Sequence, residues 1–161
     1  MSKFLILVVA LCLYLSWDKY KLRLLAPNKL PSTTAKNTQV PNCLEKKQCA
    51  VIYVAPWCPS CDQMAPQIQG FLNNSLNHPE IGVKVIIGQG RSTDENEQKA
   101  QDYRSQCKDK SIYKDIFIDS DSSLKNSLGV NYYPTFMVVN TEGRVEKRDQ
   151  NAWKWMHENL K

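Results

Sequence analysis

A predicted buried strand that leads directly into a pair of cysteines constrains this chain more than any other feature. Residues 50–55, "AVIYVA", form a continuous apolar run, which is typical of a central strand covered on both faces. The motif "WCPSC" follows, with Cys58 and Cys61 separated by two residues. Residues 59–76 then carry apolar side chains at four-residue spacing, which predicts an amphipathic helix. The two cysteines are therefore expected where a strand ends and a helix begins.

This position favours a reactive thiol at Cys58. The first turn of a helix has unpaired backbone N–H groups and the positive end of the helix dipole, and both stabilise a thiolate. Pro59 suits that turn because its missing N–H is not needed there. Cys61, one turn further on, is placed to attack a mixed disulfide formed at Cys58. Two other interpretations remain: a structural disulfide, and half of a zinc site completed by Cys43 and Cys49.

The remainder of the chain alternates between strand and helix patterns. Strands are predicted over residues 82–88, 113–119, 134–140 and 144–148, and helices over residues 92–107, 122–128 and 153–160. Ser92 and Glu95 form a capping box at the start of the second helix, and Gly129 suits the end of the third. The last two strands are joined by a turn at residues 141–143. This order predicts an α/β sandwich with a mixed sheet.

Three separated motifs resemble the thioredoxin superfamily. "WCPSC" resembles its Trp-Cys-x-x-Cys motif, and "MAP" places Pro66 where the active-site helix of the family carries a proline. "GVNYYPT", residues 129–135, resembles the segment that holds the family's cis-proline. The resemblance covers about residues 49–148. It implies a three-layer sandwich and a thiol–disulfide oxidoreductase in which Cys58 is the nucleophile and Cys61 the resolving cysteine.

The same resemblance implies a binding groove for protein thiols and disulfides. Trp57, Tyr133, Pro134 and Thr135 would shape the groove, with the Tyr133–Pro134 peptide bond in the cis form. From the sequence alone, Pro134 is also acceptable as a trans residue at the start of a strand. No cofactor and no metal are expected. The net charge of +5 comes without a basic cluster, so nucleic acid is not an expected partner.

Two departures from the cytosolic thioredoxins indicate which subgroup of the superfamily the chain resembles. Ile52 stands where those proteins have a buried aspartate on the central strand, so that proton acceptor is missing. An additional helix and strand precede Pro134, as in the membrane-anchored bacterial reductases of the cytochrome c maturation type. Glu45 and Glu80 are candidates for the acidic residue that this subgroup has near its site.

These departures favour a disulfide reductase. The Pro59–Ser60 pair carries no charge, so it adds no cationic stabilisation to the Cys58 thiolate, and this favours the same direction. The alternatives are a disulfide oxidase or isomerase, and a non-enzymatic binding or assembly module whose cysteine pair is a staple.

The N-terminal residues predict the compartment. Lys3 precedes an uncharged run over residues 4–17, which is shorter than the span of about 20 residues that crosses a membrane but suits a signal sequence. Because no small-x-small cleavage site follows, residues 1–25 are predicted to be an uncleaved signal anchor, with a cleaved signal peptide as the alternative. Residues 26–42 form a tether and residues 43–161 the domain. We expect an extracytoplasmic domain, on the periplasmic side of the inner membrane in a Gram-negative cell, with a membrane redox partner.

The other cysteines allow several pairings. Six cysteines in 161 residues favour an oxidising compartment. A local structural disulfide between Cys43 and Cys49 is the leading interpretation. A bridge from Cys107 to either of them and free thiols are the alternatives.

Overall fold

The computed structural model describes residues 46–141 and 144–161. Its strands are β1 (Gln48–Val54), β2 (Ile81–Gly88), β3 (Ile116–Asp119), β4 (Thr135–Asn140) and β5 (Val145–Arg148). Its helices are α2 (Pro59–Asn74), α3 (Thr93–Ser105), α4 (Ser123–Leu128) and α5 (Asp149–Asn159). Two 3₁₀ segments, η1 (Ser75–Asn77) and η2 (Lys110–Asp115), complete the described elements.

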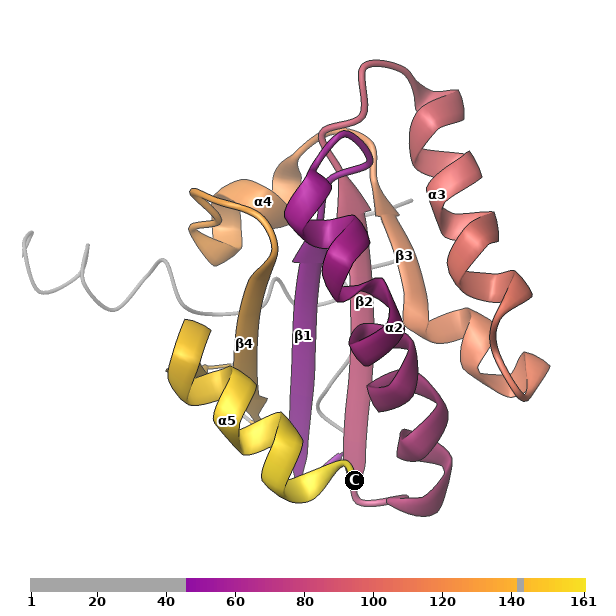
Figure 1. Cartoon of the computed structure of the whole chain (residues 1–161). Coiled ribbons are helices and arrows are strands. Elements are labelled where there is room, and N and C mark those ends of the chain that lie inside the picture. The colour runs from indigo at the N-terminus through magenta and orange to yellow at the C-terminus, as the bar shows by residue number, and fades with distance from the viewer. Residues whose placement is uncertain (1–45, 142–143) are drawn as a thin grey trace, which may run out of the picture.

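The strands form one mixed sheet in the order β3-β2-β1-β4-β5 (Figure 1). β1 pairs in parallel with β2, and β2 in parallel with β3, whereas β4 is antiparallel to both β1 and β5. β1 is the central strand, and its residues from Cys49 to Val54 are all fully buried. The α/β architecture and the mixed sheet are therefore confirmed.

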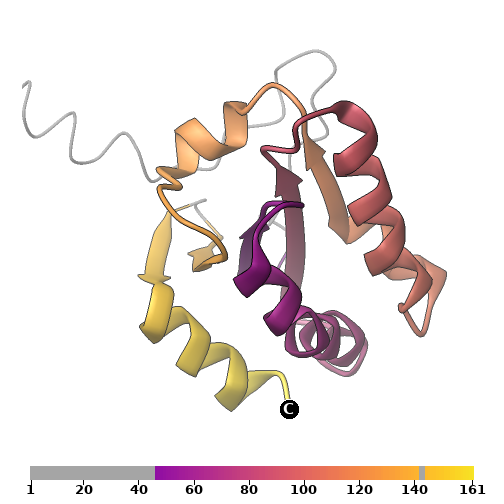
Figure 2. The same cartoon turned by 45° about the horizontal axis from the view of Figure 1, so that its top comes forward.

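Helices cover both faces of the sheet. Ile52 and Val54 of β1 face one core, with side chains from α2, α3 and α5. Val51 and Tyr53 point to the opposite face because side chains alternate along a strand, and there they pack against α4. Seen from the end of the sheet, α2 and α5 lie on one side of the strands and α4 on the other (Figure 2). This arrangement is the predicted three-layer sandwich.

Two predicted helix-capping residues, Ser92 and Gly129, are confirmed. The Ser92 side chain accepts a hydrogen bond from the Glu95 backbone N–H at 3.2 Å. The Glu95 carboxylate reaches back to the backbone N–H of Arg91, one residue before the group that a capping box uses. Gly129 ends α4 in the left-handed conformation, with φ 62°, where a residue without a Cβ carries little strain.

The strand predicted over residues 113–119 is shorter than expected. Its first three residues belong to η2, and only Ile116–Asp119 form β3. The Asp109 carboxylate accepts a hydrogen bond from the backbone N–H of Ser111 at 2.6 Å, and this cap starts the 3₁₀ turn. A local side-chain contact thus overrides the strand-like pattern of the sequence.

Several predictions concern residues outside the described ranges. They are the anchor at 1–25, the tether at 26–42, Cys43, Glu45, and residues 142–143 of the hairpin turn. Within residues 46–141 and 144–161, no helix is long and apolar enough to cross a membrane.

Candidate functional site

Cys58 is the N-cap residue of α2, at the carboxyl end of β1. Its backbone is extended, with φ −89° and ψ 110°, and Pro59 occupies the first helical turn. The Cys58 sulfur accepts a hydrogen bond from the backbone N–H of Cys61 at 3.3 Å. Both cysteines are free thiols, Cys58 being 5% exposed and Cys61 fully buried. The helix N-terminus therefore donates directly to the more accessible of the two sulfur atoms.

The loop before β4 covers the cysteine pair. The Tyr133–Pro134 peptide bond is cis, as predicted. The Tyr133 carbonyl oxygen lies 3.5 Å from the Cys58 sulfur and accepts its S–H, although the two residues are 75 positions apart. Thr135 is fully buried, and its hydroxyl donates to the carbonyl of Tyr132. Thr135 thus holds the loop from within, while Tyr133 contacts the reactive sulfur.

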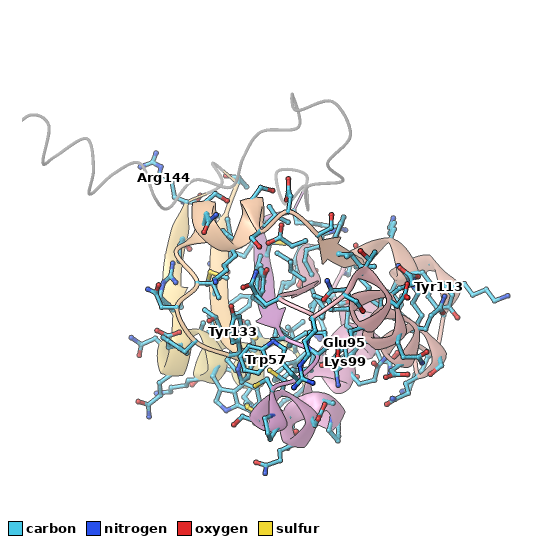
Figure 3. All side chains as sticks on the ribbon, turned by 90° about the horizontal axis from the view of Figure 1, so that it is seen from above. Trp57, Glu95, Lys99, Tyr113, Tyr133 and Arg144 are labelled. Carbon is cyan, nitrogen blue, oxygen red and sulfur yellow. The ribbon has the colours of Figure 1, made fainter. Side chains whose placement is uncertain are left out.

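The aromatic rings of two residues next to the pair contact each other. The rings of Trp57 and Tyr133 meet edge to face with their centres 5.5 Å apart, and both lie at the same end of the sheet (Figure 3). Trp57 and Tyr132 are each 49% exposed. The indole N–H of Trp57 donates to the backbone carbonyl of Gln89, the residue after β2. Sequence reasoning missed Tyr132 and Gln89, although the apolar ring of Tyr132 beside a predicted site was a usable indication.

The core below the pair is apolar. Ile52 is fully buried in the same cluster as Cys58 and Cys61, so no carboxylate of β1 lies beneath them. Burial raises the pKa of Cys61 to about 12, and the hydrogen bond with Cys58 acts in the same direction. Cys61 therefore holds its proton at neutral pH.

The prediction that Glu80 is a candidate for an acidic residue near the cysteine pair was wrong. Glu80 immediately precedes β2, whose first residue Ile81 pairs with Gln48 at the start of β1. Because the two strands are parallel, Glu80 lies at the end of the sheet opposite to Cys58. Glu45 lies outside the described residues.

A buried carboxylate does occur on the opposite face of the sheet. Asp119, at the end of β3, is 3% exposed and accepts the Tyr53 hydroxyl at 2.7 Å. It also accepts the backbone N–H groups of Leu124 and Lys125 at 3.1 and 2.9 Å, at the start of α4. The Tyr53 ring lies 5.9 Å from the ring of Tyr133. Asp119 thus holds Tyr53 of β1, the strand that ends at the cysteines, and Tyr53 in turn contacts the Tyr133 ring.

The structure settles some of the pairings that the sequence left open for the remaining cysteines. Cys49 is fully buried and disulfide-bonded, whereas its predicted partner Cys43 lies outside the described residues. Cys107 is a half-buried free thiol that donates to the Tyr103 carbonyl at 3.2 Å. The alternative of a bridge from Cys107 is therefore wrong, because α3 leaves this thiol beside its own last turn. The Cys43–Cys49 pairing stays a prediction.

Several known proteins are similar to this chain in sequence or in fold. Sporulation thiol-disulfide oxidoreductase A of Bacillus subtilis is 29% identical over 91 residues, which cover 56% of this chain and 52% of that protein. The match therefore spans about half the length of this curated relative. A putative thioredoxin from Neisseria meningitidis has a similar fold, with a TM-score of 0.54, 19% identity, and coverage of 71% of this chain and 73% of the other.

A second solved structure, of a thioredoxin-like protein in the oxidised form, has a TM-score of 0.57 and 18% identity. The similarity covers 83% of this chain and 95% of that protein. The family model described as thioredoxin-like matches residues 46–145, which contain the cysteine pair, the inserted helix α3 and the cis-proline loop. The chain therefore belongs to the thioredoxin-like family.

Proposed function

We propose that this protein is an extracytoplasmic thiol–disulfide oxidoreductase that exchanges disulfides with protein substrates. The observation that carries the proposal is the environment of the Cys58 sulfur, which lies between the Cys61 N–H and the Tyr133 carbonyl at a helix N-terminus. A site with two free thiols favours this function over a non-enzymatic module whose pair is a permanent staple. The matched relative is named for the same activity.

The chemistry follows from the different surroundings of the two sulfur atoms. As a reductase, the Cys58 thiolate attacks a substrate disulfide, which forms a mixed disulfide and releases one substrate thiolate. Cys61 then loses its proton and attacks the Cys58 sulfur. The second substrate sulfur leaves with the electron pair and takes up a proton, and the Cys58–Cys61 disulfide remains. The exposed rings of Trp57 and Tyr132 would contact the substrate, and the loop at Tyr133, Pro134 and Thr135 would hold its chain.

The site favours reduction of substrates over oxidation. Cys58 has the neutral Pro59–Ser60 pair beside it and the apolar Ile52 beneath it, so its thiolate lacks the added cation that would make the dithiol form especially stable. A less stable dithiol gives up its electrons more readily. An oxidase or an isomerase is the alternative.

The reduction potential tests both the activity and its direction. We expect equilibration with glutathione or dithiothreitol buffers to give one two-electron transition, nearer about −250 mV than about −120 mV. The oxidised fraction is measured by acid quenching, alkylation and mass spectrometry. A value near that of strong oxidants would contradict the reductase assignment, and a pair that never titrates would contradict the enzyme itself.

We further propose that residues 1–25 anchor the domain in the membrane, through the tether at 26–42, on the extracytoplasmic side. The disulfide at Cys49 supports an oxidising compartment. Electrons for a reductase there would come from a membrane redox partner. A membrane-impermeant maleimide is expected to label Cys58 in intact cells, with a Cys58→Ser variant as control. Labelling that requires cell lysis would contradict this location.

A further inference from the structure

A lysine from the inserted helix α3 pairs with the residue that follows the resolving cysteine in the chain. The Lys99 ammonium group pairs with the carboxylate of Asp62, the residue that follows Cys61. Its side chain is only 14% exposed, and the ammonium group lies 6.0 Å from the ring centre of Tyr103. Figure 3 shows Lys99 next to Trp57, at the same end of the sheet as Tyr133. α3 therefore brings a positive charge to the first turn of α2, the turn that also contains Cys61.

Lys99 also lines a groove next to the cysteine pair. The groove has a volume of about 540 Å³ and is bordered by Pro56 and Trp57 on one side. Its charged residues are Asp62, Arg91, Glu95, Lys99 and Asp102. An incoming substrate at Trp57 would cover this groove and exclude water from it, and a charge in such surroundings acts more strongly than one in open solvent.

Within residues 46–141 and 144–161, the other elements around Cys61 offer no comparable charge. β1 contributes apolar side chains such as Ile52 and Val54 to this face. From α3, Tyr103 contributes a buried hydroxyl that has no hydrogen-bond partner among the described residues. Burial raises the pKa of this hydroxyl, so it remains a neutral donor. From its own helix, Cys61 has only the Cys58 sulfur and Asp62, whose carboxylate is paired with Lys99.

Formation of the mixed disulfide increases the relative effect of the Lys99 charge on the pKa of Cys61. In the free dithiol, burial and the Cys58 sulfur both raise the pKa of Cys61, while the Ala55 backbone and the Lys99 charge lower it. Once Cys58 is bonded to a substrate sulfur, it can no longer be a thiolate and its repulsion disappears. Burial then still raises the pKa of Cys61, and the Ala55 backbone and the Lys99 charge lower it.

We propose that Lys99 is a positioning residue for the resolving step, which stabilises the Cys61 thiolate as it attacks the Cys58–substrate disulfide. This inference rests on the proposed function. In the step, the Cys61–Cys58 sulfur bond forms and the bond from Cys58 to the substrate sulfur breaks. The substrate sulfur leaves with the electron pair and is protonated by the proton that Cys61 releases to water. Lys99 remains an ammonium ion throughout.

The chain provides a matched control at Lys84. Lys84 pairs with Asp115, its side chain is 13% exposed, and its ammonium group lies 5.7 Å from the ring centre of Phe117. It therefore has an ion pair, a similarly buried side chain and an aromatic contact, as Lys99 has, although Asp115 is 13% exposed and Asp62 58%. Asp115 ends η2 and Lys84 lies inside β2, away from Cys58 and Cys61. Replacing Lys84 removes an ion pair that is more buried than that of Lys99, without changing the charge near Cys61.

The test measures the lifetime of the mixed disulfide in the full-length protein. The reduced protein is mixed rapidly with oxidised glutathione, quenched in acid at increasing times, and analysed by intact mass. We expect Lys99→Met to lengthen the lifetime of the Cys58–glutathione adduct by about two- to fourfold at neutral pH, because the thiolate fraction falls more than its nucleophilicity rises. The same resolution rate should be reached only at a pH higher by about 0.3–0.6, because the thiolate fraction rises about tenfold per pH unit below the pKa.

Three other variants separate electrostatics from structure. Lys99→Arg should restore the wild-type lifetime, Lys84→Met should leave it unchanged, and Asp62→Asn, which frees the Lys99 charge, should not lengthen it. Equal lifetimes for wild type and Lys99→Met at every pH would overturn the role of Lys99, as would the same slowing in Lys84→Met. A reduced wild type that forms neither the adduct nor the Cys58–Cys61 disulfide would instead overturn the proposed function, so the two failures are distinguishable.

Discussion

Replacement of Cys58 by serine is expected to lower the rate of protein disulfide reduction at least about a thousandfold, because a serine hydroxyl stays protonated and cannot replace a thiolate nucleophile. The change is nearly isosteric, so the fold should persist. The Cys58 sulfur accepts a hydrogen bond from the Cys61 N–H and donates one to the Tyr133 carbonyl, and a hydroxyl at the N-cap can make both. The rate is measured with a disulfide-bonded protein and a chemical reductant, and the fold is checked by circular dichroism.

Cys107→Ser is the matched control for this loss. Cys107 is also a free thiol, and it is more exposed than Cys58. It lies at the end of α3, where its sulfur contacts the Gln69 amide and the Tyr103 carbonyl. We expect this variant to retain the wild-type rate. If Cys107→Ser abolished the reaction while Cys58→Ser did not, the assignment of the nucleophile would be wrong.

Replacement of Asp119 by alanine is expected to lower the free energy of unfolding by about 3 kcal/mol, because it leaves several buried donors without an acceptor. The donors are the Tyr53 hydroxyl and the backbone N–H groups of Leu124 and Lys125. The Ser122 side chain makes no capping hydrogen bond at the start of α4, so Asp119 caps this helix in its place. Urea denaturation at neutral pH measures the change.

Two further variants test the origin of this loss. Asp121→Ala removes an exposed carboxylate that accepts local hydrogen bonds, among them one from the Ser123 backbone N–H at 3.0 Å, and should cost less than about 1 kcal/mol. Tyr53→Phe leaves Asp119 with its two backbone donors and should cost about 1–2 kcal/mol. A loss in Asp119→Ala no larger than that in Asp121→Ala would show that the buried network contributes little to stability.

The sequence predicted the parts of the site that depend on short-range patterns. An apolar run followed by a Cys-x-x-Cys motif and an amphipathic helix determines the strand-to-helix junction locally, and the structure has Cys58 at the N-cap of α2. The capping residues Ser92 and Gly129 were also predicted, because each acts on its own helix end. The resemblance to a known family supplied the cis-proline loop, which no local pattern in this chain requires.

The parts that were missed depend on contacts between distant segments. Asp119 reads as the last residue of a strand, and only the sheet order brings it to Tyr53, 66 positions away. The need for glycine at position 88 also depends on a contact between distant segments. A Cβ there would lie 2.0 Å from the Tyr53 hydroxyl oxygen, so the close approach requires glycine. In the sequence Lys99 is one charge on a polar helix, and its ion pair with Asp62, the residue after Cys61, depends on how α3 packs in the fold. Glu80 was misplaced because the parallel register of β1 and β2 was not known.

The central claim is that Cys58 attacks the substrate and Cys61 resolves the product. Its most direct test uses the Cys61→Ser variant, which can form a mixed disulfide but cannot release it. After this variant is mixed with a disulfide-bonded protein, peptide mapping by mass spectrometry should find the substrate bound to Cys58, and a Cys58→Ser, Cys61→Ser double variant should capture none. Capture through Cys107, or equal capture by the double variant, would contradict the account.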